Sequence, residues 1–237
     1  FSNVIQIPLA LALLLAATMS STDSASVFNI LRSQKMGLRN RLQPLLEFES
    51  GSNDPMAYML TIVMIQVIQG GETADVNVWT IIFNFLLQFG FGLVFGFLLG
   101  KVFVWIINKI DLQNKTLYPI MMLSFIFFIF SFTNLFHGNG YLAVYVAGIV
   151  MGNSKMTESK SISSFLDGIT WLVQIVMFLV LGMLVNPNEM FKIAVPALII
   201  GIFVILIGRP LSVFLCLLPF KGIGKRSKIF ISWVGLR

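Results

Sequence analysis

Long apolar runs separated by short polar stretches fill almost the whole chain. Apolar residues dominate roughly 4–31, 44–68, 78–107, 117–136, 141–152, 162–185 and 193–218, and another run starts near 229. Most of these runs are long enough for a helix to cross a hydrocarbon core about 30 Å thick. The pattern predicts an all-α, polytopic helical membrane protein with about seven spans and the start of an eighth. We expect a single transmembrane domain over 1–237, incomplete at both ends, because the chain begins and stops inside apolar runs.

The composition supports a membrane location. Hydrophobic residues make up 57% of the chain and charged residues only 11%. A soluble globular protein carries about 25% charged residues, because its surface faces water. Most of this protein's surface must therefore face lipid.

The basic residues mark one side of the membrane. They concentrate in every second connection, near 32–41, 101–115, 155–160 and 221–228, whereas the stretches 69–77, 137–140 and 186–192 hold only Lys192. This alternation is the positive-inside pattern, so we expect the four basic loops to be cytoplasmic. The net charge of +6 thus reflects topology and does not indicate a nucleic-acid-binding surface.

The first apolar run is interrupted by five consecutive polar residues, Ser20–Ser24. Non-helical backbone inside a membrane is tolerated where it lines a cavity or is buried in protein. A discontinuous helix of this kind commonly marks a transporter's binding site. The alternative is two half-length segments joined by a polar turn at the membrane surface.

Small residues recur at four-residue spacing in two segments. Gly92, Gly96 and Gly100 form one series, and Gly148 and Gly152 form another. This spacing predicts close helix packing, although glycine is also common in membrane helices for other reasons. The stretch 136–140 predicts a tight turn that pairs the helices on either side, with His137 as a loop residue.

Asp54 is the strongest candidate for a functional side chain. It lies ten residues after Pro44, which corresponds to about 15 Å of helix and thus about half of the membrane core. By the same measure, Asp23 and Arg237 lie about 13–14 Å from the basic residues Arg32 and Lys228. Because a charge at the membrane centre is costly, these residues are candidates for function.

The neighbours of Asp54 predict an oxygen-rich cation site. Ser50 lies one helical turn before Asp54 on the same face, with Asn53 beside it. Pro55 has no N–H, so the carbonyl of Gly51 loses its helical partner. The interrupted segment could add Thr22 or Asp23. Such a site suits a hard monovalent cation, and one carboxylate that takes either a cation or a proton is the minimal chemistry of exchange.

Other charges have weaker interpretations. Glu49 needs a cationic partner to lie near Asp54, and Arg237 at matching depth is the predicted partner. Asp167 and Arg209 either extend toward the inner membrane surface or pair with each other. The acids around Asp54 could also line an aqueous vestibule without binding any specific ion.

Several classes of function have little support. No nucleophile–base pair and no metal-ligand spacing stands out, so we expect neither an enzyme, nor a cofactor, nor a transition-metal site. Cys216 is the single cysteine. A proton-coupled transporter of a small organic solute would need polar groups on several helices, and a cation channel would need a carbonyl-lined filter.

Three motifs carry a resemblance to a known family. They are Ser21-Thr22-Asp23, Glu49-Ser50-Gly51-Ser52-Asn53-Asp54-Pro55 and Trp233-Val234-Gly235-Leu236-Arg237. In this order they resemble motifs of the monovalent cation/proton antiporter family 1, which includes bacterial NhaP-type exchangers. Gly138–Val144 and Ala147–Asn153 are also similar to it. The sequence around Asp54 is most similar to that of the potassium/proton subgroup associated with cell-volume regulation.

The resemblance implies an inverted-repeat antiporter fold and an elevator-type exchange of K⁺ or Na⁺ for H⁺. It implies a homodimer in the bacterial inner membrane, with a role in pH homeostasis. Asp54 would be shared by cation and proton, with Ser50 and groups near Thr22 and Asp23 as further ligands. The Asn53–Asp54 pair implies electroneutral one-for-one exchange, and Glu49 would pair with Arg237. We expect further spans on both sides of this chain.

Overall fold

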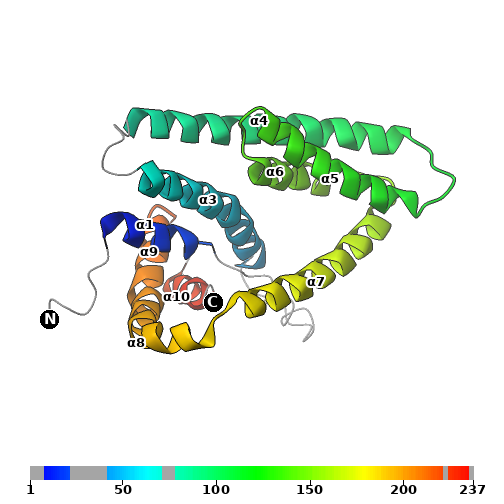
Figure 1. Cartoon of the computed structure of the whole chain (residues 1–237). Coiled ribbons are helices and arrows are strands. Elements are labelled where there is room, and N and C mark those ends of the chain that lie inside the picture. The colour runs from blue at the N-terminus through cyan, green and yellow to red at the C-terminus, as the bar shows by residue number, and fades with distance from the viewer. Residues whose placement is uncertain (1–7, 22–41, 71–77, 221–223, 235–237) are drawn as a thin grey trace. The chain divides into compact units, whose positions relative to one another are not determined.

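The computed structural model describes residues 8–21, 42–70, 78–220 and 224–234. Every regular element in these ranges is a helix, as the sequence predicts (Figure 1). The chain divides into two compact units, one formed by Phe1–Ile68 with Asn186–Arg237 and the other by Gln69–Val185. Each unit has a buried apolar cluster of its own.

The first unit contains both ends of the chain. Its described elements are α1 (Leu9–Thr18), α3 (Leu42–Gly70), α8 (Pro187–Phe203), the π-helical turn η2 (Val204–Gly208), α9 (Arg209–Cys216) and α10 (Lys225–Val234). Asn186 caps the N-terminus of α8 by accepting a hydrogen bond from the Asn188 N–H, and Pro187 occupies the first turn. An apolar cluster of Leu42, Leu46, Val213 and Ile231 joins α3, α9 and α10.

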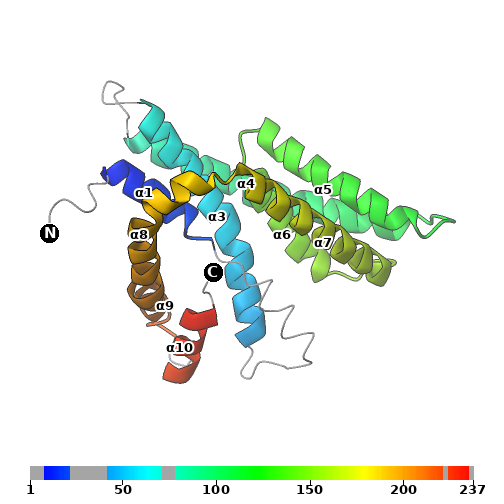
Figure 2. The ribbon, with the colours of Figure 1, turned by 60° about the horizontal axis from the view of Figure 1, so that its bottom comes forward.

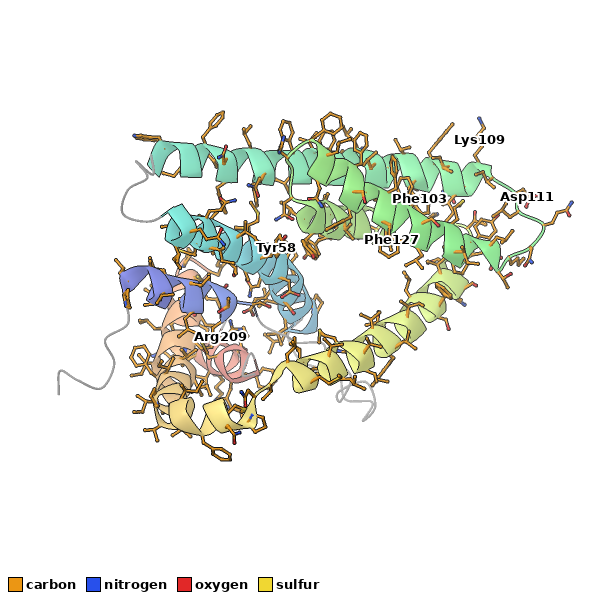
Figure 3. All side chains as sticks on the ribbon, in the orientation of Figure 1. Tyr58, Phe103, Lys109, Asp111, Phe127 and Arg209 are labelled. Carbon is orange, nitrogen blue, oxygen red and sulfur yellow. The ribbon has the colours of Figure 1, made fainter. Side chains whose placement is uncertain are left out.

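The second unit consists of α4 (Val78–Lys109), α5 (Leu117–Leu135), α6 (Gly140–Gly152) and α7 (Ser159–Leu184). Helices α4, α5 and α6 lie side by side (Figures 1 and 2). Their core includes Phe103, Ile107 and Ile129, all fully buried. The Phe103 ring stacks on Phe125 with 4.3 Å between ring centroids, and Figure 3 shows Phe103 on the side of α4 nearest α5 and α6.

The packing of α4 against α6 depends on glycine. A Cβ on Gly96 would lie 2.5 Å from the Ala143 carbonyl oxygen, and one on Gly100 would lie 3.0 Å from the Ala147 Cα. The predicted close approach is therefore confirmed for the series Gly92, Gly96 and Gly100. At Gly148 and Gly152 the described residues make no such approach, since none of their atoms lies within 4 Å of a Cβ there, and Ala143 and Ala147 occupy the face of α6 toward α4.

The predicted tight turn between α5 and α6 is also present. His137 adopts a left-handed conformation with φ 57°, and the Gly138 N–H donates to the Thr133 carbonyl over 2.9 Å. Asn139 caps α6 by accepting from the Leu142 N–H, and its own N–H donates to the Gln88 carbonyl of α4 over 3.0 Å. The turn is thus fastened to the neighbouring helix as well as to itself.

Polar contacts also join the α4–α5 connection, with the end of α4, to the α6–α7 connection. The Asn108 amide nitrogen donates to the Lys155 carbonyl over 2.8 Å, and its oxygen accepts from the Thr157 N–H over 3.0 Å. Lys115 pairs with Glu158 at 2.6 Å. Through the hydrogen bond and charge of Glu158, this contact raises the pKa of Lys115 above its usual value. These loops carry two of the basic stretches expected in the cytoplasm.

Four described helical stretches are long and apolar enough to cross a bilayer: Ile82–Lys109, Leu117–Leu135, Ser159–Leu184 and Ile193–Cys216. The apolar helices Leu9–Thr18 and Gly140–Gly152 are shorter. Helix α3 has 29 residues, which span about 44 Å, but polar residues interrupt its apolar character. Helices are therefore observed in the described part of each predicted segment, and the polar helix α3 holds the candidate site.

Candidate functional site

Helix α1 stops where the sequence predicts an interruption. The Thr18 hydroxyl donates to the Leu15 carbonyl over 2.9 Å, and the Ser20 hydroxyl donates to the Ala17 carbonyl over 2.7 Å. Such side-chain bonds compete with the backbone ladder and favour a helix end. After the turn at Met19 and Ser20, Ser21 continues in an irregular conformation. The predicted end of the first half-helix is confirmed, whereas Thr22 and Asp23 lie outside the described residues.

Ser21 reaches the central carboxylate of α3. Its hydroxyl donates a 2.5 Å hydrogen bond to the Oδ1 atom of Asp54, across 33 residues of sequence. The Asp54 side chain is exposed, and its second oxygen accepts no hydrogen bond from the described residues. The end of α1 and the middle of α3 therefore place a hydroxyl and a carboxylate together, with carboxylate oxygen still open to solvent.

The backbone beside Asp54 adds a further oxygen. Pro55 lies inside α3 and is buried, and the proline ring provides no N–H for the Gly51 carbonyl. Ser50 and Asn53 are half-buried on the same stretch of helix. Of the predicted ligands, the structure thus describes Asp54, Asn53 and Ser50 on one helix and brings Asp54 to the end of α1.

Glu49 forms an ion pair with Arg209. The Nη2 atom of Arg209 lies 2.5 Å from the Oε1 atom of Glu49, and the two side chains are 14% and 25% exposed. A guanidinium at this distance neutralises the carboxylate and orients it by a charge-assisted hydrogen bond. Arg209 lies among the helices of the first unit, as its label in Figure 3 shows.

A π-helical turn precedes Arg209. In η2 the Arg209 N–H bonds to the carbonyl of Val204, five residues earlier. The next residue, Pro210, cannot donate a backbone hydrogen bond, and its ring would collide with a carbonyl in a regular helix. Proline and π-turns are the usual places where a helix deviates. The deviation lies directly before the arginine that reaches α3.

Apolar packing sets the register between α3 and α9. Leu46 and Val213 belong to one buried cluster. Glu49 lies about one turn after Leu46, and Arg209 lies about one turn before Val213. The packing of the two apolar side chains therefore brings the acid and the base to the same level.

The sequence interpretation was incomplete at two residues. It selected Thr22 and Asp23 on the interrupted segment, whereas Ser21 makes the observed contact with Asp54. It considered Arg209 as extending to the membrane surface or as a partner of Asp167, whereas the structure pairs Arg209 with Glu49. The available signals were the position of Ser21 beside Thr22 and the Gly208-Arg209-Pro210 sequence inside an apolar segment. The predicted partner Arg237 lies outside the described residues.

The two carboxylates Glu49 and Asp54 differ in the groups that they contact. Glu49 faces a permanent cation, so its charge is already compensated. Asp54 faces only a neutral hydroxyl among the described residues, and it is exposed. Of these two carboxylates, Asp54 is therefore the one that has no fixed cationic partner among the described residues.

The chain is similar to a known protein family and to several named antiporters. A family described as "Sodium/hydrogen exchanger, transmembrane" matches residues 1–237. The chain is 42% identical over 225 residues to the K⁺/H⁺ antiporter NhaP of Alkalimonas amylolytica, covering 95% of this chain and 38% of that protein. It is 41% identical over 225 residues to the K⁺/H⁺ antiporter NhaP2 of Shewanella sp. (strain MR-4), with the same coverage.

A Na⁺/H⁺ antiporter and a solved antiporter structure are also similar to this chain. The Na⁺/H⁺ antiporter NhaH of Halobacillus aidingensis is 30% identical over 245 residues, covering 99% of this chain and 59% of that protein. The solved structure of the sodium proton antiporter MjNhaP1 from Methanocaldococcus jannaschii at pH 8 aligns with a TM-score of 0.81 at 22% identity. That alignment covers 97% of this chain and 58% of the MjNhaP1 chain. The chain thus spans less than two thirds of each of these proteins, and it shares the helical fold of the aligned part of MjNhaP1.

Proposed function

This chain belongs to the sodium/hydrogen exchanger family, and we propose that it forms the ion-binding part of a bacterial monovalent cation/proton antiporter. The observation that carries the proposal is the contact between Ser21 and Asp54, which joins the end of a discontinuous helix to a carboxylate inside a long membrane helix. Membership of this family indicates a secondary transporter and not an enzyme.

Asp54 is the shared group in the proposed mechanism. When deprotonated, its carboxylate binds a dehydrated cation together with the Ser21 hydroxyl and the Gly51 carbonyl, to which Pro55 offers no N–H. Carbonyl and carboxylate oxygens can replace the hydration shell of a monovalent cation. Ser50 and Asn53 of α3, with Thr22 and Asp23 of the interrupted segment, complete the proposed site. When a proton occupies Asp54, the cation loses its counter-charge and leaves.

Potassium is the cation that the similarities favour. The relatives with 42% and 41% identity are K⁺/H⁺ antiporters by name, whereas the relative with 30% identity is named a Na⁺/H⁺ antiporter. The oxygen ligands themselves suit either ion. We therefore propose K⁺ as the preferred cation of the full-length protein, with Na⁺ as the competing ion.

The division into two units supports an elevator-type mechanism. One unit holds Ser21, Glu49, Asp54 and Arg209, whereas the other has its own tightly packed core. Such a mechanism moves one part of a transmembrane domain against another to expose a site alternately on each side.

We propose a homodimer in the inner membrane, with the loops near 32–41, 101–115, 155–160 and 221–228 in the cytoplasm.

The decisive experiment uses the full-length protein in liposomes with an imposed pH gradient, read by a pH-sensitive dye. Addition of K⁺ should dissipate the gradient with saturable kinetics, and Na⁺ should do so at higher concentration. The dye must be followed in parallel with the cation itself. Cation flux without opposite proton movement, or unitary currents in a planar bilayer, would overturn the proposal in favour of a channel.

A further inference from the structure

Helix α4 carries a stripe of aromatic and basic side chains near its C-terminal end. Phe97, Lys101, Trp105 and Lys109 follow one another at four-residue spacing, and all four are exposed. The Lys101 ammonium lies 4.3 Å from the centroid of the Phe97 ring, and the Lys109 ammonium lies 4.8 Å from that of the Trp105 ring. Each lysine thus folds back over the aromatic ring one turn before it. We call these four residues the basic–aromatic stripe.

The stripe lies away from the helices that pack on α4. Gly96, Gly100 and Phe103 mark the packed face, since a Cβ on either glycine would meet α6 at 3.0 Å or less and Phe103 is 1% exposed. At 100° per residue, Lys101 and Lys109 lie about 130–150° around the helix axis from the centre of this face. Figure 3 shows Lys109 and Phe103 on opposite sides of α4. Both lysines therefore project outward from the bundle of α4, α5 and α6.

Lys101 lies at a depth where a cation needs a partner. The candidate span Ile82–Lys109 has 28 residues, which extend over about 42 Å and exceed a hydrocarbon core of about 30 Å. If the span is centred in this core, the Lys101 backbone lies about 7 Å inside the core boundary. A charge at such a depth is unfavourable unless it reaches water or an anion. The flexible side chain of a lysine is long enough to extend to the boundary and meet an anion there.

Among the described residues, no acid forms an ion pair with either lysine of the stripe. The ion pairs of these residues join Lys115 to Glu158 and Arg209 to Glu49. Asp111, the nearest acid along the sequence, is exposed in the loop after α4 (Figure 3). An aromatic ring attracts an ammonium group but carries no net negative charge. The positive charge of the stripe is therefore available to an anion from outside the described residues.

The apolar residues beside Lys101 indicate which kind of anion fits. Toward the middle of the span, the outer face of α4 continues with Val94 and Leu98, which are 51% and 52% exposed. The face is thus basic near the end of α4 and apolar toward the membrane centre. A phospholipid has the same order of headgroup and acyl chains, whereas a small inorganic anion would contact only the basic end. Trp105 between the lysines is typical of the headgroup level.

We propose that the basic–aromatic stripe binds an anionic phospholipid. Its phosphate lies between Lys101 and Lys109, and its acyl chains follow α4 past Leu98 and Val94. The two lysines are about 12 Å apart along the helix, so both long side chains reach a phosphate placed between them. Clustered basic residues at this level of a membrane protein favour anionic over zwitterionic headgroups. The lipid site lies wholly in the second unit and does not depend on exchange at Asp54.

The first test measures lipid binding to the purified full-length protein by native mass spectrometry. The probes are phosphatidylglycerol, which is anionic, and phosphatidylethanolamine with the same acyl chains, which is zwitterionic. The unchanged protein should bind phosphatidylglycerol several-fold more tightly. Lys101→Gln and Lys109→Gln should each lower this affinity several-fold, and the double variant should bind the two lipids equally. Lys101→Arg retains the charge and should retain the preference.

Lys115→Gln is the matched control for the loss of one positive charge. Lys115 is exposed and follows α4, but it lies outside the stripe and pairs with Glu158. This variant should leave the phosphatidylglycerol affinity unchanged. An equal loss in Lys115→Gln would indicate attraction to the net charge alone and overturn the proposal, as would stripe variants that bind like the unchanged protein. Displacement of the lipid by inorganic phosphate would identify a small-anion site instead.

The second test measures whether the bound lipid stabilises the fold. Phosphatidylglycerol should raise the unfolding temperature of the full-length protein in detergent, and of Lys115→Gln, but not that of the double variant Lys101→Gln with Lys109→Gln. An acid of the protein outside the described residues is the competing partner of these lysines. In that case the double variant would already unfold at a lower temperature without lipid, and phosphatidylglycerol would not stabilise the unchanged protein. That result overturns the lipid site and leaves the proposed exchange function untouched.

Discussion

Glu49 and Arg209 form an ion pair at 2.5 Å although 160 residues separate them in the sequence. The pair connects the helix that carries Asp54 to the segment that follows a π-helical turn. Of Glu49 and Asp54, only Asp54 has no permanent counter-charge among the described residues. Two carboxylates on neighbouring turns of one helix thus have different chemistry because only one of them meets an arginine.

The coupling of this pair can be measured by a double-mutant cycle. Glu49→Gln and Arg209→Gln should each lower the unfolding temperature of the full-length protein in detergent, because each leaves an uncompensated charge. For fully buried pairs the loss is about 3–5 kcal/mol, and the partial exposure of this pair should reduce it. The double variant should lose less than the sum, with a coupling of about 0.5–3 kcal/mol. Strictly additive losses would show that the residues are independent.

A second double-mutant cycle tests whether Glu49 also pairs with Arg237, the partner that the sequence predicts. A parallel cycle with Glu49→Gln and Arg237→Gln should also show coupling if both arginines share the carboxylate. Coupling with Arg209 alone would identify the structural pair as sufficient. Coupling with Arg237 alone would contradict the observed contact.

Asp54→Asn should abolish cation/proton exchange while the protein stays folded. An amide keeps the shape of the carboxylate, but it neither releases a proton nor supplies a negative charge to a cation. Exchange is followed by dye in liposomes, and folding by the elution profile and unfolding temperature. Asp111→Asn serves as the matched control, since Asp111 lies in an exposed loop. Residual pH-dependent exchange in Asp54→Asn would move the shared proton to another residue.

Ser21→Ala should raise the apparent KM for the cation and leave some transport. The hydroxyl donates to the Oδ1 atom of Asp54, and hydrogen bonds to charged groups contribute about 1.5–3 kcal/mol. Ser20→Ala is the matched control, because the neighbouring hydroxyl bonds to the Ala17 carbonyl instead. Equal KM values in the two variants would remove Ser21 from the site.

The stoichiometry should be one cation for one proton. With Asp54 as the single exchanging carboxylate, no net charge moves in a cycle, so an imposed membrane potential should not change the rate. The membrane potential is imposed on K⁺-free liposomes by a gradient of a second ion together with an ionophore for that ion. A clear acceleration would indicate a second titrating acid, with Asp23 as the first candidate.

Gly96→Ala should destabilise the full-length protein by about 1–3 kcal/mol, as overpacking typically does. The new Cβ would lie 2.5 Å from the Ala143 carbonyl oxygen and 2.9 Å from its Cα, so α4 and α6 would have to separate. Gly90→Ala on the same helix is the control, because nothing lies within 4 Å of its Cβ position. Unfolding temperatures in detergent compare the two, and equal values would argue against tight packing at Gly96.

The helices themselves were predictable from the sequence because their signals are local. Apolar runs predicted the helices, and polar residues predicted their ends near Ser20, two residues after the end of α1, and at the turn after Leu135. The depth of Asp54 and the missing N–H of Pro55 also depend only on neighbours along the chain. The candidate carboxylate was therefore identified before any tertiary contact was known.

The tertiary structure decided which distant side chains meet. Depth alone made Arg237 the partner of Glu49, but depth does not specify the rotation of a helix about its axis. The packing of Leu46 with Val213 sets that rotation for α3 and α9, and it turns Arg209 toward Glu49. Likewise, the three residues Ser21, Thr22 and Asp23 are equivalent by depth, and only the path of the backbone after Ser20 brings the Ser21 hydroxyl to Asp54. Contacts between segments depend on side-chain packing in three dimensions, which periodicity along one segment does not encode.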